Sequence, residues 1–527
     1  MFRLFLFAVV SAVSLFAQET SKNKGVDLPV FVITGKENIE LGTAEKLPPP
    51  PLRVITEEFI KPSYDPDFLD AMIVSNPFEN KLIPKEIPLR YKSKLSGSLG
   101  LITLPSIDYS TLANFSEATI SAGLSADYHR PYVSYADNYS ISPFFDAAYK
   151  VIQPGTFFDK QKLNFFGKYN FQSYNFITDT SGIKRDISRF DIGLRAANSD
   201  GEFWKYKTEI KTQAISLVNE NIKESRTFLS GALGFSGSNF EMAPNAMISF
   251  NSESNLDGIN HSAALIEANT PVKLTLSDVV SLSASFRGIV YDSIKSFKPN
   301  FGAVLKISSF LAISASFNPG YEVFDLRREL ENNRYAIAFT YPLYIYSIDN
   351  RFNYSMTVES AKIFDLTFGF STAKSDNYPY FKDAGAGKYK MQLVKTSIYK
   401  LSADLRIHPS SYGYYIANVT YNGIKNVLGQ YLPNVSPINI YAVYGYTLEK
   451  GVVIKTGAKF LSRRYADIQN NVHIPYYLSI FGELGYSFSR EFLLSVKIDN
   501  LLNKENYILK GYKEPRLNLE LGIEFQW

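Results

Sequence analysis

The chain has 527 residues, a formal net charge of +4, 45% hydrophobic and 20% charged residues, and no cysteine. Charge this close to balance gives no electrostatic footprint for nucleic acid. The absence of cysteine excludes disulfides, thiolate metal sites and cysteine nucleophiles. The 36 Tyr and 40 Phe against 2 Trp are an aromatic content that suits strands and interfaces.

The first 17 residues, MFRLFLFAVVSAVSLFA, have the layout of a secretory signal peptide. Arg3 precedes an apolar run over residues 4–16, and the small residue Ala17 follows it. The run is shorter than the ~20 apolar residues that a membrane-spanning helix needs. We therefore expect residues 1–17 to be removed after Ala17 and the mature chain to be exported.

Residues 18–94 form a proline-rich segment, which we call the arm. Its prolines gather in KLPPPPLRVI (46–55), KPSYDPDF (61–68) and NPFENKLIPKEIPL (76–89). Proline removes backbone donors and favours extended polyproline II, so the arm is predicted to be mostly extended, with one helical turn near residues 67–73. It is either periplasmic or a partial filler of the barrel lumen.

Residues 95–527 alternate apolar and polar side chains in short segments, with no helical period and no tandem repeat. Examples are FLAISASF (310–317), IFDLTFGFS (363–371) and GVVIKTGAKF (451–460). Tight reversals are predicted within VTYNGIK (419–425) and LTLSDVVSLS (274–283). The pattern predicts successive β-hairpins.

The chain ends in LNLELGIEFQW, in which apolar residues of one parity alternate with polar residues or glycine. Because successive side chains of a strand point to opposite faces, this ending predicts a strand with one apolar and one polar face.

About 22 such segments of about ten residues are present, the length that a tilted strand needs to cross a bilayer, although fewer strands are possible. Secreted all-β modules would use fewer, shorter strands with breaks between domains. A sheet in lipid must close on itself because unpaired backbone groups are costly there. The predicted fold is therefore an all-β, transmembrane, antiparallel up-and-down barrel over residues 95–527. Its apolar parity faces lipid, and polar residues such as Asp365, Lys455, Lys459 and Glu524 face the interior.

The last strand resembles the terminal signal that many bacterial outer-membrane barrels present to the barrel assembly machinery. That signal has a polar residue, a glycine and two alternating terminal aromatics. The positions that match are Glu520, Gly522, Phe525 and Trp527. The resemblance implies an outer-membrane location and the assembly machinery as a partner.

Residues 473–527 resemble the C-terminus of a TonB-dependent receptor barrel. The third-last strand opens on Pro475, Tyr476 and Tyr477, and a Gly-aromatic-Pro-Arg turn is matched by Gly511, Tyr512, Pro515 and Arg516. The family's Asn-Leu-hydrophobic-Asn-Lys-aromatic motif is matched by Asn500, Leu501, Leu502, Asn503, Lys504 and Tyr507. The match covers about the last fifth of the chain and concerns its architecture.

Within the arm, LPVFVITGK (28–36) resembles the box that such receptors offer to a periplasmic energy-coupling protein as an added strand. An extended segment that pairs with a sheet edge can transmit a pull through backbone hydrogen bonds. An ordinary short strand is the alternative. The residues of the box are Val30, Phe31, Val32, Ile33 and Thr34.

The family places a globular plug domain between the box and the barrel, and the arm is too short for it. Barrels of 22 strands otherwise carry a plugged lumen. Three alternatives follow: the arm folds inward, a plug-supplying partner fills the barrel, or the pore is open and has fewer strands.

No catalytic, metal or cofactor site is predicted. DAGAGKY (383–389) lacks the spacing of a phosphate-binding loop and is predicted to be a flexible outer loop. GFSGS (234–238) misses the nucleophile-elbow spacing by one residue. His408 near Ser410 and Ser411 is predicted to end a loop, and no two histidines have metal-ligand spacing.

Three functions remain open at this point. The first is a receptor or transporter-like barrel that binds or passes a solute, or serves as the membrane component of an envelope complex whose periplasmic partner engages the arm. The second is a passive diffusion porin. The third is a barrel enzyme, for which the sequence supplies no nucleophile, base and oxyanion site.

Overall fold

The computed structural model describes most of the chain from Lys92 onward. The described residues are 92–133, 138–152, 161–177, 184–198, 204–254, 260–292, 294–338, 343–360, 363–410, 413–448, 451–489 and 491–527. The predicted signal peptide, the arm up to residue 91 and the box at residues 30–34 lie outside them. None of the helices among the described residues is long and apolar enough to cross a membrane.

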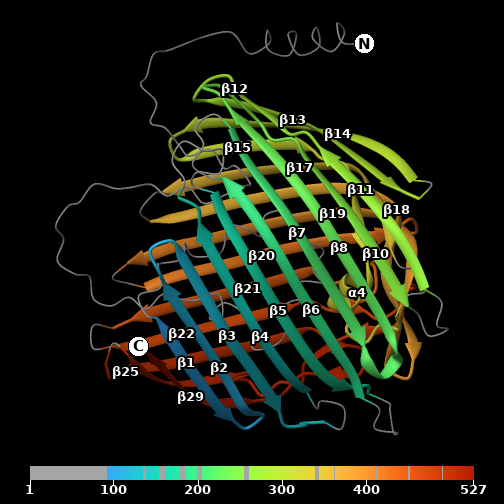
Figure 1. Ribbon diagram of the computed structural model, residues 1–527. Helices are drawn as coiled ribbons and strands as arrows, with labels where there is room; N and C mark the ends of the chain where they lie inside the picture. Colours follow the sequence, from blue (N-terminus) through green and yellow to red (C-terminus); the bar gives the residue numbers. More distant parts are fainter. Residues whose placement is uncertain are drawn as a thin grey trace, which may run out of the picture.

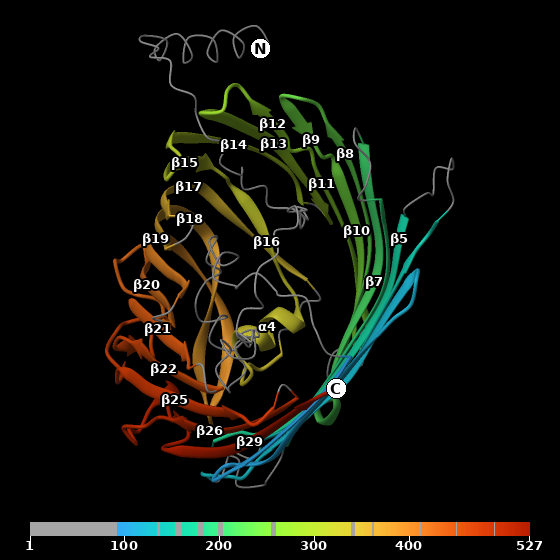
Figure 2. The same ribbon diagram turned by 90° about the vertical axis from the view of Figure 1, so that its left-hand side faces the viewer.

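The main sheet is a closed antiparallel barrel (Figures 1 and 2). It contains 25 segments, and three of its strands are each broken in two, so the wall has 22 strands. The unbroken strands are β1 Ser93–Gly100, β2 Thr103–Asn114, β3 Ala118–His129, β4 Asn138–Lys150, β5 Gln161–Asn175, β6 Lys184–Asn198, β7 Trp204–Leu217, β8 Ile222–Ser236, β13 Val280–Tyr291, β14 Ile294–Ser308, β17 Tyr344–Ser360, β18 Phe364–Gly385, β19 Lys388–Ser410, β20 Gly413–Asn426, β21 Ile438–Thr447, β22 Val452–Leu461, β25 Tyr477–Ser487, β26 Phe492–Asp499 and β29 Asn518–Gln526.

The three breaks coincide with prolines. They are Pro244 between β9 (Phe240–Met242) and β10 (Asn245–Ser254), Pro271 between β11 (Asn260–Asn269) and β12 (Val272–Thr275), and Pro319 between β15 (Leu311–Phe317) and β16 (Gly320–Phe324). Proline donates no hydrogen bond to a ladder, so each strand is interrupted there and resumes beyond it.

The wall closes where the first strand pairs with the last. β1 and β29 run antiparallel from Lys94 opposite Gln526 to Gly100 opposite Glu520. The backbone N–H groups of Lys92 and Ser93 both donate to the carbonyl of Trp527, at 3.0 and 2.9 Å. This pairing leaves neither strand with a free edge, which a sheet in lipid requires.

The two faces of the wall differ as the alternation predicts. On β29 the apolar parity, Leu519, Leu521, Ile523 and Phe525, is exposed on the outer surface. Glu520, of the other parity, is buried on the inner face. A continuous outer surface of exposed aliphatic and aromatic side chains needs an apolar solvent, which a bilayer supplies.

The barrel has two unlike rims. At one rim, which holds both the start of β1 and the end of β29, most strands are joined by short turns such as residues 115–117 and 309–310. We call this the terminal rim. The opposite rim carries the long connections, residues 318–343, 427–437, 462–476 and 500–517, and we call it the long-loop rim. Short periplasmic turns and long extracellular loops are typical of outer-membrane barrels.

The two predicted reversals have different outcomes. Residues 277–279 do turn the chain between β12 and β13, where Val280 N–H donates to the carbonyl of Ser277. The prediction for residues 419–425 is wrong, because Asn422 and Gly423 lie inside β20. The buried Asn422 amide donates to the Ser436 carbonyl at 3.2 Å, and a Cβ on Gly423 would lie 3.1 Å from the Tyr421 ring. Here the dipeptide serves packing within a strand.

The all-β fold is confirmed, and the barrel contains one short helix that has no counterpart in the predicted pattern. The connection from β15 to β17 contains β16 and the short helix α4 (Leu326–Asn332), which lie inside the ring of strands in Figure 2. The Asp325 side chain caps α4 by accepting from the N–H of Arg328 at 2.9 Å. This inward connection positions the site.

Candidate functional site

Residues 318–338, which we call the cap, cross the lumen near the long-loop rim. β16 extends the β17 ladder, pairing from Gly320 opposite Ile348 to Phe324 opposite Tyr344. α4 then packs Leu326 and Leu330 against the inner face of β5–β8. The covered wall residues are Tyr174, Ile187, Ile215, Leu217 and Ile222. The cap therefore joins two parts of the wall that lie far apart in the sheet.

Three polar contacts fix α4 to that wall. Arg327 binds Asp191 of β6 through two nitrogens, at 2.6 and 3.0 Å. Arg226 of β8 pairs with Asp325 at 3.0 Å. The Leu326 N–H donates to the buried Glu224 carboxylate at 2.8 Å. Ion pairs held in fixed two-pronged geometry and partly shielded from water are the kind that hold a segment in place.

The end of the cap meets the tip of the β18–β19 hairpin and a third loop. Ile337 N–H donates to the Tyr389 carbonyl at 2.7 Å, and Tyr389 N–H donates to that of Tyr335 at 3.1 Å. The Tyr335 ring stacks on Tyr512 with centroids 3.7 Å apart. Tyr512 in turn donates to the Gly387 carbonyl at 2.6 Å. Elements from three parts of the chain thus converge over the lumen.

A cavity of about 410 Å³ lies between the cap and the wall. Its walls combine four arginines, four carboxylates and four apolar or aromatic side chains. They are Arg226, Arg287, Arg327, Arg328, Glu267, Glu322, Asp325, Glu331, Phe228, Met247, Tyr321 and Val323. We call this the lumenal pocket.

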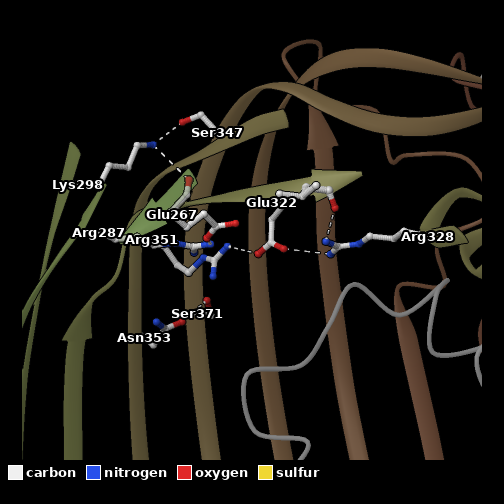
Figure 3. A network of polar contacts seen from close by, with 11 residues as sticks. Glu267, Arg287, Lys298, Glu322, Arg328, Ser347, Arg351, Asn353 and Ser371 are labelled. Atoms are coloured by element: carbon white, nitrogen blue, oxygen red, sulfur yellow. Dashed lines mark hydrogen bonds and ion pairs between the residues drawn. The ribbon is translucent and has the colours of Figure 1, made fainter. Parts of the chain in front are cut away.

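A polar network extends from the lumenal pocket along β16 and β17 (Figure 3). The Glu322 carboxylate of β16 accepts hydrogen bonds from Arg328 of the cap at 3.1 Å and from Arg351 of β17 at 3.3 Å. Arg287 pairs with Glu267 at 2.7 Å across β13 and β11. The ion pairs balance the charge of the pocket.

Lys298 of β14 extends the same network. Its ammonium donates to Asp349 and to Ser347, both at 2.5 Å, and to the Gly320 carbonyl at 3.3 Å. This lysine therefore ties the start of β16 to the wall beneath it.

The site offers hydrogen-bond donors and acceptors of both charges around the cavity. Such a surface can bind a polar solute by exchanging its internal ion pairs for contacts with that solute. Among the described residues, no group of three or more His, Asp or Glu side chains is arranged to hold a metal ion.

The four residues of the predicted assembly signal lie on or just after β29. Glu520 accepts from Thr103 at 2.5 Å and from the Asn518 amide at 2.8 Å. Gly522 lies opposite Ser98 and Ser495. Phe525 and Trp527 face outward and stack at 5.2 Å, close to the terminal rim. They contribute to the seam and lie far along the chain from the cap.

The predicted C-terminal family motif builds the connection between β26 and β29. Asn500 donates to the carbonyls of Lys504 and Pro515, at 2.7 and 3.2 Å, and both Asn500 and Asn503 have positive φ. Lys504 lies over the Tyr476 ring at 3.2 Å. Leu501 and Leu502 are exposed, and Tyr507 begins the short strand β27 (Tyr507–Leu509). These residues shape a loop and do not line the lumenal pocket.

Charged groups reinforce that loop. Hydrogen bonds from Lys513, Tyr507 and Arg516 lower the pKa of Glu505 to about 2. Because the carboxylate form is the one that is stabilised, the contribution of these ion pairs persists at neutral pH and is lost only as the pH falls toward 2. Burial raises the pKa of Glu514, which accepts from Tyr477 at 2.6 Å.

The three segments considered above for catalysis form parts of strands and turns. The predicted flexible loop at 383–389 is a tight hairpin turn, in which Gly385, Ala386 and Gly387 all have positive φ. Such φ values at consecutive residues suit a two-residue turn between twisted strands. GFSGS ends β8 and turns toward β9, and His408 lies in β19. The structure brings none of the three together.

The residues of the cap and of the lumenal pocket were not predicted from the sequence. One signal for α4 is present in the sequence: Asp325 at an N-cap position precedes Leu326 and Leu330, which are spaced for one face of a helix. The partners of that helix are about 100 to 140 residues away in the chain, so no local pattern indicates them.

No protein-family model matches the sequence, and no curated protein matches it. Solved structures do match. A mutant of the ferric enterobactin receptor PfeA from Pseudomonas aeruginosa superposes with a TM-score of 0.64 at 9% identity, over 82% of this chain and 80% of that chain. The siderophore receptor PirA from Acinetobacter baumannii gives 0.65 at 10%, over 84% and 82%. The FrpB iron transporter from Neisseria meningitidis gives 0.65 at 9%, over 83% and 81%.

The fold defines a class: a closed 22-strand antiparallel barrel with an outward apolar surface and a polar interior. Within that class, the chain has the barrel fold of TonB-dependent receptors. Identities of 9–10% establish the fold alone.

Proposed function

We propose that the chain is an outer-membrane, receptor-like transporter barrel that binds a polar solute beneath its cap and engages a periplasmic partner through its arm. The observation that carries this proposal is the cap itself. A segment that continues from the wall strand β15 enters the lumen, and it is fixed to the distant strands β6 and β8 by Arg327–Asp191 and Arg226–Asp325. A barrel built for selective passage needs such an obstruction, which must move or be bypassed when the solute passes.

A passive diffusion porin is the alternative. An open aqueous channel is the expected interior of a porin. Here the cap, the β18–β19 hairpin tip and the loop at 507–514 meet inside the long-loop rim, supporting a gated barrel. The similar solved structures are receptors and a transporter, which supports transport over catalysis.

The lumenal pocket supports a solute that carries charge. Its arginines and carboxylates are already paired, so a neutral apolar solute would have to displace ion pairs without replacing them. A charged solute with several oxygen or nitrogen atoms can take over those contacts. Charge on the solute is therefore the property that this site selects.

The arm is proposed to recruit the periplasmic partner through residues 30–34. A photo-crosslinking residue at Val32 should capture a periplasmic protein in intact envelopes. The matched control places the same photo-crosslinking residue at position 54, in place of Val54 of the arm outside the box. This variant should capture that protein much less. Capture of no periplasmic protein from Val32, or equal capture from both positions, would contradict the partner role.

A further inference from the structure

A band of basic side chains lines the lumen on β5, β6 and β7, in the half of the barrel toward the terminal rim. We call it the basic stripe, and it consists of Lys162, Lys168, Arg195, Lys205, Lys207 and Lys211. Pairing registers place these residues side by side: Lys168 lies opposite Asp191, and Arg195 lies opposite Glu209. Lys211 follows on the same face of β7, two residues from Glu209.

Two observations place the stripe on the inner face. Arg327 of α4, which lies inside the barrel, reaches Asp191 on this face. The other parity of the same strands carries the cross-strand row Phe165, Leu194 and Ile210, whose side chains are exposed on the outside. The cations of the stripe therefore point into the lumen.

Acidic partners for the stripe are few. On this part of the inner face, Asp191 is engaged by Arg327, and Glu209 is shared by Arg195 at 3.0 Å and Lys207 at 3.9 Å. Within the part of the chain that the structure describes, Lys162, Lys168 and Lys205 form no ion pair. Among the described residues, Asp146 of the neighbouring β4 shares this face and accepts from the Asn164 amide at 2.8 Å. Six cations over three carboxylates leave an excess positive charge in the lumen, which attracts an anionic segment.

The arm contains a segment of the opposite charge. Residues 57–79, EEFIKPSYDPDFLDAMIVSNPFE, hold six acidic residues and one lysine. The acidic residues are Glu57, Glu58, Asp65, Asp67, Asp70 and Glu79. Four aromatic residues, Phe59, Tyr64, Phe68 and Phe78, accompany them.

We propose that residues 57–79 of the chain's own arm dock on the basic stripe and occupy the lumen from the terminal rim. The root of the arm is at the right place, because Lys92 is hydrogen-bonded to Trp527 at that rim. Lys162 and Lys205 also lie near the terminal-rim ends of their strands. The acidic segment and the stripe thus share one entrance to the barrel.

The connecting residues are long enough. Residues 80–92 can span roughly 45 Å when extended. The stripe lies four to six strands from β1, which is about 20–30 Å along the wall at the usual strand spacing. The box at residues 30–34 stays free for the proposed periplasmic partner, because 22 further residues separate it from the acidic segment.

Cysteine crosslinking tests this docking, because the natural chain contains no cysteine. Asp67→Cys is combined with Lys207→Cys on the stripe, and a short bismaleimide is added to intact envelopes. The matched control combines Asp67→Cys with Lys497→Cys, which shares the inner face with Glu520 on the other side of the seam and lies only two strands from β1. Crosslinking to position 207 should exceed that to position 497 severalfold, although position 497 lies nearer the root of the arm.

Charge reversal then tests whether charge attraction causes the docking. With the 67–207 pair kept, changing Lys162, Lys205 and Lys211 to Glu should reduce crosslinking severalfold, and adding Asp65→Lys and Asp70→Lys should restore it. High salt should also reduce it. Equal crosslinking at both positions, insensitivity to reversal, or capture of a different protein at position 207 would overturn the proposal. None of these readouts depends on solute transport or on partner capture from Val32, so the proposed function is tested separately.

Discussion

Deleting the cap should expose the lumen to large reagents from the long-loop side. In the intact chain, Gln213 on the inner face of β7 is half-buried and lies beside Arg327 of α4. When residues 320–338 are replaced by a short Gly/Ser linker, Gln213→Cys should react with a polyethylene-glycol maleimide added outside whole cells. Its rate should rise from near background toward that of an open surface site.

Leu428→Cys supplies that surface reference, because Leu428 is 78% exposed in the β20–β21 connection. It should be labelled at the same rate with and without the cap. If Gln213→Cys were already labelled rapidly in the intact chain, residues 318–338 would not obstruct the lumen. If it stayed protected after the deletion, another segment would be the obstruction.

Replacing Arg226 by alanine should undock the cap without deleting it. Arg226 lies beside two carboxylates, pairing with Asp325 and neighbouring Glu224, and its removal leaves them facing each other with little access to water. Breaking a buried ion pair by removing one partner costs about 3–5 kcal/mol. At 1.4 kcal/mol per factor of ten, the docked population should fall by roughly 100-fold to 4,000-fold relative to the undocked one.

The readout is the maleimide labelling of Ile187→Cys, because α4 covers Ile187 completely in the docked state. Lys395→Ala is the matched control, since its ion pair with Asp376 is exposed at 63% and 68% of the two side chains. An exposed pair contributes at most about 1 kcal/mol, so this variant should leave labelling of position 187 unchanged. Equal effects of the two substitutions would show that Arg226 does not hold the cap.

The wall was predictable because its signal is local. Alternation along LNLELGIEFQW fixes which side chains of β29 face outward, and the number of such segments gives the strand count. Bilayer thickness sets the length of each segment, and lipid requires closure. These constraints hold for every strand independently of its neighbours, so the fold follows without knowledge of any contact.

The cap was not predictable for the opposite reason. Leu326 and Leu330 find their partners on β5–β8, and Arg327 finds Asp191 across 136 residues of sequence. A loop that folds inward looks locally like a loop that folds outward. The same limit explains the error at Asn422–Gly423, where the dipeptide predicts a turn but the Ser436 carbonyl holds the asparagine within a strand.

The basic stripe shows how sequence and structure contribute different halves of one inference. The charge of residues 57–79 is evident from the sequence, but its significance depends on where cations gather. Lys168, Arg195 and Lys207 belong to three separate strands, and only the pairing register places them on one face. The acidic residues 57–79 and the basic stripe become complementary once the barrel is closed.

Ion conductance of the purified, full-length chain in a planar bilayer tests the central claim most directly, namely that a 22-strand wall is obstructed by the chain's own residues. The account predicts that the protein inserts, as judged by its co-flotation with lipid vesicles, and that it passes no steady current in the planar bilayer. Intact insertion with a steady ohmic current, of the size that a wide water-filled barrel supports, would contradict it and favour a passive porin.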